Sequence, residues 1–305
     1  MRIIKHKGFL IALVSALIIS SSFIACDMKD NLENEKANLE NNTEKDKASN
    51  NKENSTDNTN EKSNNDSTSE TNKNRFEGLK TTSEDMNIPV LCYHDVTPKN
   101  PNNNELLVNP EKFKEQLQYL KDNNYTPITL DELYDYLRNN KPLPEKPVVI
   151  TFDDGYKGNY EYAYPLLKEF KFPATVFMIS NYVGAPDFMT ADQLKEMSNN
   201  GIEIESHTFK HDDLSTLDEA KQLETLKDSK VNLEKIIEKP VDFVAYPFGR
   251  YNSSTRVAAE KAGYKLGFNL NGNFADRKDN NFNIDRIYVS NNDSLKKFES
   301  RLTGK

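Results

Sequence analysis

From Ile88 onward, short apolar runs alternate with longer stretches in which apolar and polar residues are mixed. Several of the short runs are rich in β-branched residues and apolar on both faces, which is typical of buried parallel strands. The clearest run is Val-Val-Ile-Thr-Phe at residues 148–152. The predicted strands are Val90–Tyr93, Tyr125–Ile128, Val148–Phe152, Ala174–Ile179, Ile202–Ser206, Phe243–Tyr246, Lys265–Asn269 and Arg286–Val289.

The longer stretches carry apolar residues at intervals of three and four, which predicts amphipathic helices. In the first of them, Phe113, Leu117 and Leu120 would share one face, and Asn109 followed by Pro110 is a typical helix start. The predicted helices are Pro110–Asn123, Leu130–Asn139, Asn159–Phe170, Ala191–Asn199, Leu217–Ile237, Ser253–Ala262 and Ser294–Leu302.

Strands and helices alternate seven or eight times, which indicates parallel strands joined by helical crossovers. We therefore expect an α/β fold, a distorted or incomplete (β/α) barrel of seven to eight parallel strands. A doubly wound open sheet remains the alternative, because the sequence does not show whether the sheet closes. In both arrangements the carboxyl ends of the strands carry the chemistry.

The beginning of the chain does not follow this alternation. Three basic residues stand within the first seven positions, and an apolar run from Gly8 to Ile19 follows, as in an export signal. The sequence Phe23-Ile24-Ala25-Cys26 resembles a bacterial lipobox. We expect residues 1–26 to be a lipoprotein signal peptide and lipobox, with a lipidated Cys26 attaching the protein to the outer face of the cell membrane. A secreted protein and an uncleaved membrane anchor are the alternatives.

Residues 27–86 consist almost entirely of Asn, Glu, Lys, Asp, Ser and Thr. Such a tract cannot bury enough apolar surface to offset the entropy lost on ordering, so we expect a disordered polar linker. Residues 87–305 would then form one folded domain. The formal net charge of −8 gives no reason to expect a nucleic-acid partner. Cys92 lies in an apolar run without a second cysteine in this domain, and we expect it to be a core residue.

Two adjacent carboxylates, Asp153 and Asp154, stand at the end of the clearest strand, and Gly155 would allow a sharp turn after them. Neighbouring carboxylates repel each other unless a cation separates their roles. One of them could bind a metal ion while the other acts as a base. The structural alternative is a turn that only caps a helix.

Histidines are rare in this chain, and three of the four follow predicted strands. His207 and His211 are four residues apart, a spacing that lets two imidazoles bind one ion. With one aspartate they would form a two-histidine, one-carboxylate set, which suits zinc with an open position, or cobalt, nickel or iron. A third cluster, Tyr246-Pro247-Phe248-Gly249, ends the strand Phe243–Tyr246.

At these residues the chain resembles a known family. Thr151–Gly155 and His207–His211 are similar to the first two motifs of polysaccharide deacetylases of the NodB-homology type, carbohydrate esterase family four. The resemblance covers roughly residues 87–289. It implies a deformed (β/α) barrel and the metal-dependent hydrolysis of N-acetyl groups on an amino-sugar polymer. It further implies that Asp153 is the general base and that the metal ligands are Asp154, His207 and His211.

The third motif departs from the family pattern Arg-x-Pro-Tyr. The matching residues are Ala245-Tyr246-Pro247-Phe248, so the arginine that would steady Asp153 is absent there. Arg286 or Arg250 could supply the charge, and we favour Arg286 because it begins a strand-like run. From this motif we expect Tyr246, Pro247 and Phe248 to contact the substrate or, through a backbone N–H near Phe248, its oxyanion.

The second departure concerns the general acid. Many family members carry a histidine in a late Leu-x-His motif, but no histidine follows His211 here. His94, in Tyr93-His94, lies at the end of the first predicted strand, and a barrel brings its first and last strands together. This arrangement resembles the exported poly-β-1,6-N-acetylglucosamine deacetylase branch, which implies that His94 is the general acid. The structural alternative is a histidine that is hydrogen-bonded in the barrel rim.

The resemblance implies a hydrolase of linear amides that acts on a surface or cell-wall polymer of N-acetylglucosamine, with poly-β-1,6-N-acetylglucosamine as the favoured substrate. A peptidoglycan or chitin-oligomer deacetylase and an O-acetyl esterase are alternatives. A non-catalytic protein that binds wall polysaccharide is an alternative of another class. Asp153 argues against it, because a structural metal site would not need this second acid.

Overall fold

The computed structural model describes residues 75–304. The expected signal peptide and lipobox, residues 1–26, and the expected linker up to residue 74 lie outside this range. In the part of the chain that is described, none of the helices has a stretch long and apolar enough to cross a membrane.

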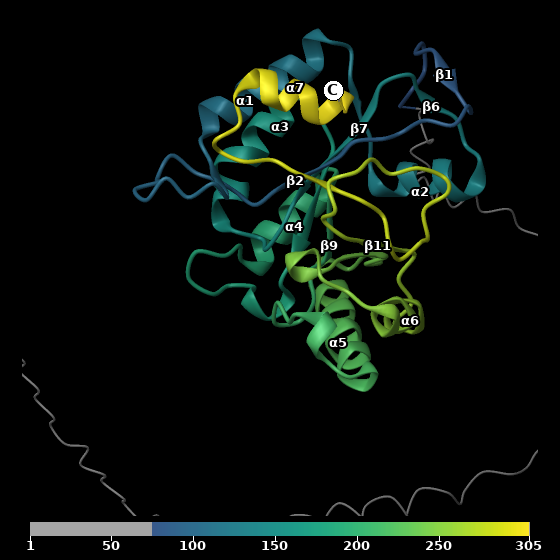
Figure 1. Ribbon diagram of the computed structural model, residues 1–305. Helices are drawn as coiled ribbons and strands as arrows, with labels where there is room; N and C mark the ends of the chain where they lie inside the picture. The colour runs from purple at the N-terminus through teal and green to yellow at the C-terminus, as the bar shows by residue number, and fades with distance from the viewer. Residues whose placement is uncertain (1–74, 305) are drawn as a thin grey trace, which may run out of the picture. The chain divides into compact units, whose positions relative to one another are not determined.

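A parallel sheet lies at the centre of the described domain (Figure 1). Seven of its strands follow the order β11-β10-β9-β8-β7-β2-β12, and an eighth, β5, pairs with the beginning of β7. The strands are β2 (Val90–Tyr93), β5 (Thr126–Pro127), β7 (Pro147–Phe152), β8 (Ala174–Met178), β9 (Ile202–Ser206), β10 (Phe243–Ala245), β11 (Leu266–Phe268) and β12 (Ile287–Tyr288).

The sheet curls so that the last strand meets the first. Ile287 pairs with Leu91 of β2, and shortly before it Ile284 forms a parallel bridge to Phe268 of β11. Residues 284–287 therefore contact both β2, the first strand of the barrel in sequence, and β11, near its end. The order β2-β7-β8-β9-β10-β11 runs in one direction, without the reversal that a doubly wound sheet requires. The predicted distorted, incomplete barrel is confirmed.

Helices surround the sheet, and α7 lies beside α1 with Tyr119 and Phe298 in edge-to-face contact (Figure 1). The segment 159–170, expected to be one α-helix, begins as a π-helix instead. The helices are α1 (Pro110–Asp122), α2 (Leu130–Asn139), η1 (Asn159–Ala163, π), α3 (Tyr164–Phe170), η2 (Ser180–Tyr182), α4 (Ala191–Asn199), η3 (Leu214–Thr216), α5 (Glu219–Ile237), η4 (Pro247–Gly249), α6 (Ser253–Lys261) and α7 (Leu295–Thr303).

The sheet is buried on both faces, so its residues divide between two apolar clusters. On β7, Val148 and Ile150 belong to the larger cluster that the surrounding helices cover, whereas Val149 belongs to a smaller one. The smaller cluster also contains Phe177, Phe243 and the buried side chains of α2. Burial on both faces is what produces the nearly continuous apolar runs of the sequence.

The end of the predicted linker differs from the structure. Residues 75–86 were expected to be disordered, but β1 (Thr81–Thr82) pairs with β6 (Leu143–Pro144) just after α2. The hydroxyl of Tyr136 donates a hydrogen bond to the carbonyl of Glu84, 2.8 Å away, and accepts one from the N–H of Met86, 2.7 Å away. The partners are some 50 residues apart in sequence, so the composition of residues 75–86 alone does not predict these contacts.

We predict that Tyr136→Phe lowers the free energy of unfolding by about 1–2 kcal/mol, because two backbone groups lose their partner. Chemical denaturation of the full chain measures this change. Tyr134→Phe on the same helix is the matched control, since among the described residues its hydroxyl has no hydrogen bond; it should change stability by less than about 0.5 kcal/mol. Equal effects of the two substitutions would contradict the proposed anchoring.

Two acids lie on β9, Glu203 half-buried and Glu205 buried, a feature that the strand pattern did not reveal. Glu203 accepts hydrogen bonds from the N–H of Leu130, 2.9 Å away, and from the hydroxyl of Thr175, 2.6 Å away. Glu205 accepts one from the N–H of Phe243, 2.7 Å away. Burial raises the pKa of Glu203 to about 7 and the pKa of Glu205 well above its usual value.

A raised pKa means that the folded protein binds the Glu203 proton more tightly than the unfolded chain does. Stability from this group is therefore complete below pH 4.5, its unperturbed pKa, and is lost as the pH rises through about 7. We predict that Glu203→Gln reduces the fall in unfolding free energy between pH 5 and pH 8 by about 2–3 kcal/mol. The control is Glu145→Gln, which removes a surface partner of Lys80. A wild-type pH profile in Glu203→Gln would refute the assignment.

Candidate functional site

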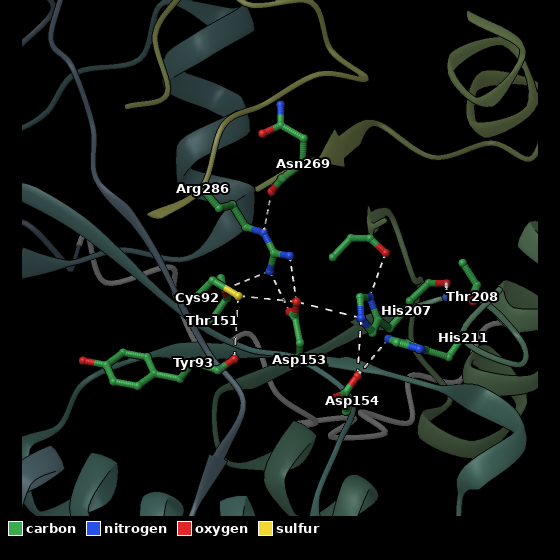
Figure 2. A network of polar contacts seen from close by, with 12 residues as sticks. Cys92, Tyr93, Thr151, Asp153, Asp154, His207, Thr208, His211, Asn269 and Arg286 are labelled. Carbon is green, nitrogen blue, oxygen red and sulfur yellow. Dashed lines mark hydrogen bonds and ion pairs between the residues drawn. The ribbon is translucent and has the colours of Figure 1, made fainter. Parts of the chain in front are cut away.

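The turn after β7 places two carboxylates in one space. Asp154 has a left-handed φ of 70°, and Gly155 follows with a φ of 85°. A Cβ at Gly155 would lie 2.0 Å from the Met178 sulfur, and the left-handed φ would strain any other residue, so glycine is strongly favoured at this position. Asp153 is 3% exposed and Asp154 is 6% exposed. Figure 2 shows the result of this turn: Asp153 faces Arg286 and Asp154 faces His207 and His211.

The turn after β9 brings two imidazoles to the same place. Nδ1 of His207 lies 2.8 Å from the carbonyl oxygen of Ala245, and this contact directs Nε2 toward the acids. Nε2 of His207 lies 3.5 Å from Oδ1 of Asp154, and Nε2 of His211 lies 3.3 Å from the same oxygen. The two ring centroids are 5.0 Å apart. The three expected metal ligands thus converge although they come from two strands.

The donor atoms of Asp154, His207 and His211 fit a divalent cation. Tetrahedral zinc with ligand bonds of about 2.0–2.1 Å separates its ligands by about 3.3–3.4 Å, close to the distances above. Oδ1 of Asp154 is buried without a hydrogen-bond partner, which is costly unless a cation or proton satisfies it. The carbonyl of Ala245 favours the His207 tautomer whose Nε2 lone pair is free, as metal ligation requires. The three donor atoms lie within 4.8 Å of one another.

Asp153 has a different set of neighbours. Arg286 is completely buried and donates to Oδ1 of Asp153 at 2.6 Å and to Oδ2 at 2.8 Å. Burial disfavours the charged carboxylate, but Arg286 and then His207 outweigh burial and hold the pKa of Asp153 well below its usual range. Asp153 is therefore ionised, and Oδ2 lies 3.8 Å from Nε2 of His207.

Cys92 was expected to be a core residue, and it is fully buried. The structure also places its sulfur 3.4 Å from Oδ2 of Asp153, where it donates a weak hydrogen bond. Burial raises the pKa of the thiol well above its usual value, so this donor keeps its proton. The sequence analysis missed this contact, although in β2 Cys92 pairs in register with Thr151 of β7, two residues before Asp153.

His94 is a near neighbour of Asp153 and Cys92. One of its ring nitrogens, the sulfur of Cys92 and a carboxylate oxygen of Asp153 are within 4.8 Å of one another. Nδ1 of His94 is buried without a hydrogen-bond partner, and its ring meets that of Tyr288 at 5.8 Å in an edge-to-face contact. For the expected alternative, a histidine hydrogen-bonded in the barrel rim, the structure shows no hydrogen bond at Nδ1.

The third motif divides between core and surface. Tyr246 is completely buried, and its hydroxyl donates to the carbonyl of Phe282 at 3.1 Å. Its side chain thus lies in the core and does not face the expected substrate, and Pro247 is buried as well. Phe248 is 58% exposed, with a left-handed φ of 60°, and its ring lies 4.5 Å from that of His211. Arg250, the other candidate for pairing with Asp153, pairs with Asp213 instead, at 2.8 Å.

The sequence of this chain is similar to those of known polysaccharide deacetylases. A family model described as polysaccharide deacetylase matches residues 140–267. YxkH of Bacillus subtilis (strain 168), which is classed with the polysaccharide deacetylases, is 37% identical over 209 residues, covering 68% of this chain and 74% of that protein. The poly-beta-1,6-N-acetyl-D-glucosamine N-deacetylase of Staphylococcus aureus (strain MRSA252) is 34% identical over 197 residues, covering 60% of this chain and 68% of the relative.

Solved structures agree with the sequence relatives. The deacetylase PplD of Streptococcus pyogenes, solved in complex with acetate, superposes with a TM-score of 0.68 at 34% identity, covering 72% of this chain and 99% of that one. IcaB from Ammonifex degensii superposes with a TM-score of 0.62 at 26% identity, covering 71% of this chain and 96% of that one.

We predict that Asp154→Ala weakens the binding of zinc or cobalt by about a hundredfold or more, since it removes one of three ligands. Asp153→Asn should keep one equivalent of metal, because Arg286 and not a cation is its partner. Metal analysis after gel filtration, combined with competition titration, measures both. The ligand assignment fails if the two variants retain metal equally well, or if the Asp153 variant alone loses it.

Proposed function

The chain belongs to the polysaccharide deacetylase family, and we propose that it hydrolyses the N-acetyl groups of poly-β-1,6-N-acetylglucosamine with one divalent metal ion. The observation that carries this proposal is the division of the two acids. Asp154 faces two imidazoles, whereas Asp153 is held ionised by Arg286 outside the ligand set. A site that only bound a cation for stability would not need an arginine-paired second acid.

The family is metal-dependent as a rule, and zinc is our first choice, with cobalt, nickel or iron as alternatives. When bound by Asp154, His207 and His211, the cation supplies Lewis acidity, which lowers the pKa of a water molecule and polarises the acetamide carbonyl. We assign the proton of that water to Asp153, whose Oδ2 lies 3.8 Å from Nε2 of His207. Arg286 fixes the carboxylate through two hydrogen bonds, so the base needs no reorientation.

An amide needs a proton on its leaving nitrogen, because an amine anion departs poorly. We assign this proton to His94, one of whose ring nitrogens lies within 4.8 Å of a carboxylate oxygen of Asp153. Its buried Nδ1 has no hydrogen-bond partner in the described protein, so the ring can still take up a partner. The products are acetate and a polymer with a free amine, which is cationic at neutral pH.

The substrate would approach from the side of His211 and Phe248. The His211 side chain is 26% exposed, whereas the side chains of Asp153 and His207 are at most 4% exposed. The exposed ring of Phe248 next to His211 offers an apolar face for a sugar or an acetyl group. We also propose a backbone N–H near Phe248 as an oxyanion donor, since the strained turn directs this segment toward the ligand set.

The β-1,6 linkage is supported by the Staphylococcus aureus relatives, whose name gives poly-beta-1,6-N-acetyl-D-glucosamine as the substrate. The proposed early histidine acid supports it as well. Peptidoglycan, chitin oligomers and O-acetyl esters remain the alternatives. Acetate release from β-1,6-linked and β-1,4-linked N-acetylglucosamine oligomers and from peptidoglycan, at matched concentrations, separates them. A preference for the β-1,4-linked substrates would overturn the linkage and keep the reaction.

We further propose that the domain works at the outer face of the cell membrane, attached through a lipidated Cys26. The basic start, the apolar run and the Phe23–Cys26 sequence support this location. A polar tract between anchor and domain would let the enzyme reach a surface polymer. Metabolic labelling with a fatty-acid analogue tests the anchor, and Cys26→Ala should abolish the label.

We predict that Asp153→Asn lowers kcat by about 10²–10⁴-fold on an N-acetyl substrate, the usual range for loss of a general base. His94→Ala should produce a similar loss on the amide but a smaller loss on an O-acetyl ester, because an alkoxide leaves more readily than an amine anion. Acetate release on both substrates gives the comparison. Equal losses of His94→Ala on amide and ester would remove the acid assignment, and an active Asp153→Asn would remove the base assignment.

A further inference from the structure

Three asparagine side chains surround one buried carboxylate beside the site. Asp285 is 8% exposed and accepts hydrogen bonds from the Nδ2 groups of Asn269 at 2.5 Å, Asn271 at 3.0 Å and Asn273 at 2.8 Å. In the sequence these donors form the pattern Asn-x-Asn-x-Asn directly after β11. Neither the metal ligands nor the proposed acid and base account for this arrangement.

Asn269 connects this carboxylate to the base-bearing side of the site. Its side chain donates to Asp285, its carbonyl accepts from Nε of Arg286 at 3.1 Å, and its N–H donates to the carbonyl of Ile284 at 2.9 Å. Asn269 is completely buried. Figure 2 shows it directly above the Arg286 guanidinium, on the side away from Asp153. One asparagine therefore contacts both Asp285 and its neighbour Arg286.

The partners of Asp285 are neutral amides, so the Arg286 guanidinium does not pair with Asp285 and is available to pair with Asp153. Asp285 and Arg286 are adjacent in an extended segment, so their side chains leave the backbone on opposite sides. The guanidinium hydrogen bonds go to Asp153, Thr151 and the carbonyl of Asn269. A buried carboxylate without a cation needs several donors, and the three amides provide them.

The same loop also touches the turn of the third motif. A Cβ at Gly249 would lie 2.7 Å from Cβ of Leu270 and 2.9 Å from its N, so the loop packs directly on the turn that presents Phe248. The ring of Phe248 in turn lies against His211. Displacing residues 269–273 would thus disturb the arginine and the exposed aromatic ring together.

We propose that Asp285 and Asn269 are positioning residues that hold Arg286 against Asp153 by ordering the loop 269–273. This inference rests on the proposed function, in which Asp153 is the base. The two residues do not bind the proposed metal ligands, and their effect on the base passes through Arg286.

The test compares Asp285→Ala, Asp285→Asn and the matched control Asp276→Ala in the full chain. The control removes a carboxylate from the same loop region that accepts only local backbone bonds, such as the N–H of Lys278 at 2.6 Å. Asp285→Ala should lower kcat about tenfold with KM changed less than about twofold and metal content unchanged, the effect of a misplaced base. Asp285→Asn keeps one accepting oxygen, so its kcat should fall less. The kcat of Asp276→Ala should equal that of the wild type.

A double-mutant cycle with Arg286→Ala tests whether Asp285 acts through the arginine. In that background Asp285→Ala should cause no further loss of kcat, because the positioned group is already gone. A loss of the same factor with and without Arg286 would overturn the inference, and so would a wild-type kcat in Asp285→Ala. Thermal unfolding of each variant shows whether it is folded, and so separates a loss of kcat caused by misfolding from one caused by a displaced Arg286.

A readout that needs no activity distinguishes failure of this inference from failure of the proposed function. Nε–H of Arg286 is buried and bonded to Asn269, so its NMR signal should exchange slowly with water in the wild type. In Asp285→Asn it should shift and exchange faster, and in Asp276→Ala it should stay. An unchanged signal in Asp285→Asn refutes the positioning role, even if the wild type releases no acetate. Absent acetate release together with the expected change refutes only the function.

Discussion

The buried ion pair between Arg286 and Asp153 is the interaction on which the site depends. Taking both charges out of water costs several kcal/mol for each ion, and attraction between them offsets this only with good geometry and further hydrogen bonds. Here the guanidinium donates twice to Asp153 and also to Thr151 and the carbonyl of Asn269. The pair joins residues 133 positions apart, so it can form only after the sheet has curled.

This pair also explains how two adjacent carboxylates acquire different properties. Asp153 and Asp154 are neighbours in sequence and both are buried, so burial alone would treat them alike. The left-handed turn directs Asp154 to His207 and His211 and leaves Asp153 to the arginine. Environments that separate two titratable groups in this way are typical of acid and base assignments in hydrolases. The arginine thus keeps Asp153 charged without a metal bond.

Local patterns predicted the strands, most helices and the convergence of Asp153, Asp154 and the two histidines, because parallel strands bring their carboxyl ends to one edge. Features that depend on distant contacts were not predictable. Nothing near Tyr246 in sequence shows that its hydroxyl bonds to the carbonyl of Phe282, and polar composition hid the pairing of Thr81–Thr82 with β6. The Asn-x-Asn-x-Asn pattern was visible, but its carboxylate partner lies 12 to 16 residues away and has no periodic signal.

Both departures from the family motifs lead to one place in the structure. The motif arginine is absent after β10 and the late histidine is absent near the C-terminus, yet Arg286 precedes β12 and His94 follows β2. These two strands are paired, with Ile287 beside Leu91, and the rings of His94 and Tyr288 are in contact across them. Residues at the junction of the first and last strands can therefore bring both the arginine charge and the proposed proton donor close to Asp153. The closing segment has few ladder hydrogen bonds, because its strand β12 is only two residues long, and it therefore needs further contacts to hold it in place. In our proposal the asparagine cluster around Asp285 meets this need, so that the proposed catalytic groups at the junction and the polar cluster beside Arg286 belong to one arrangement.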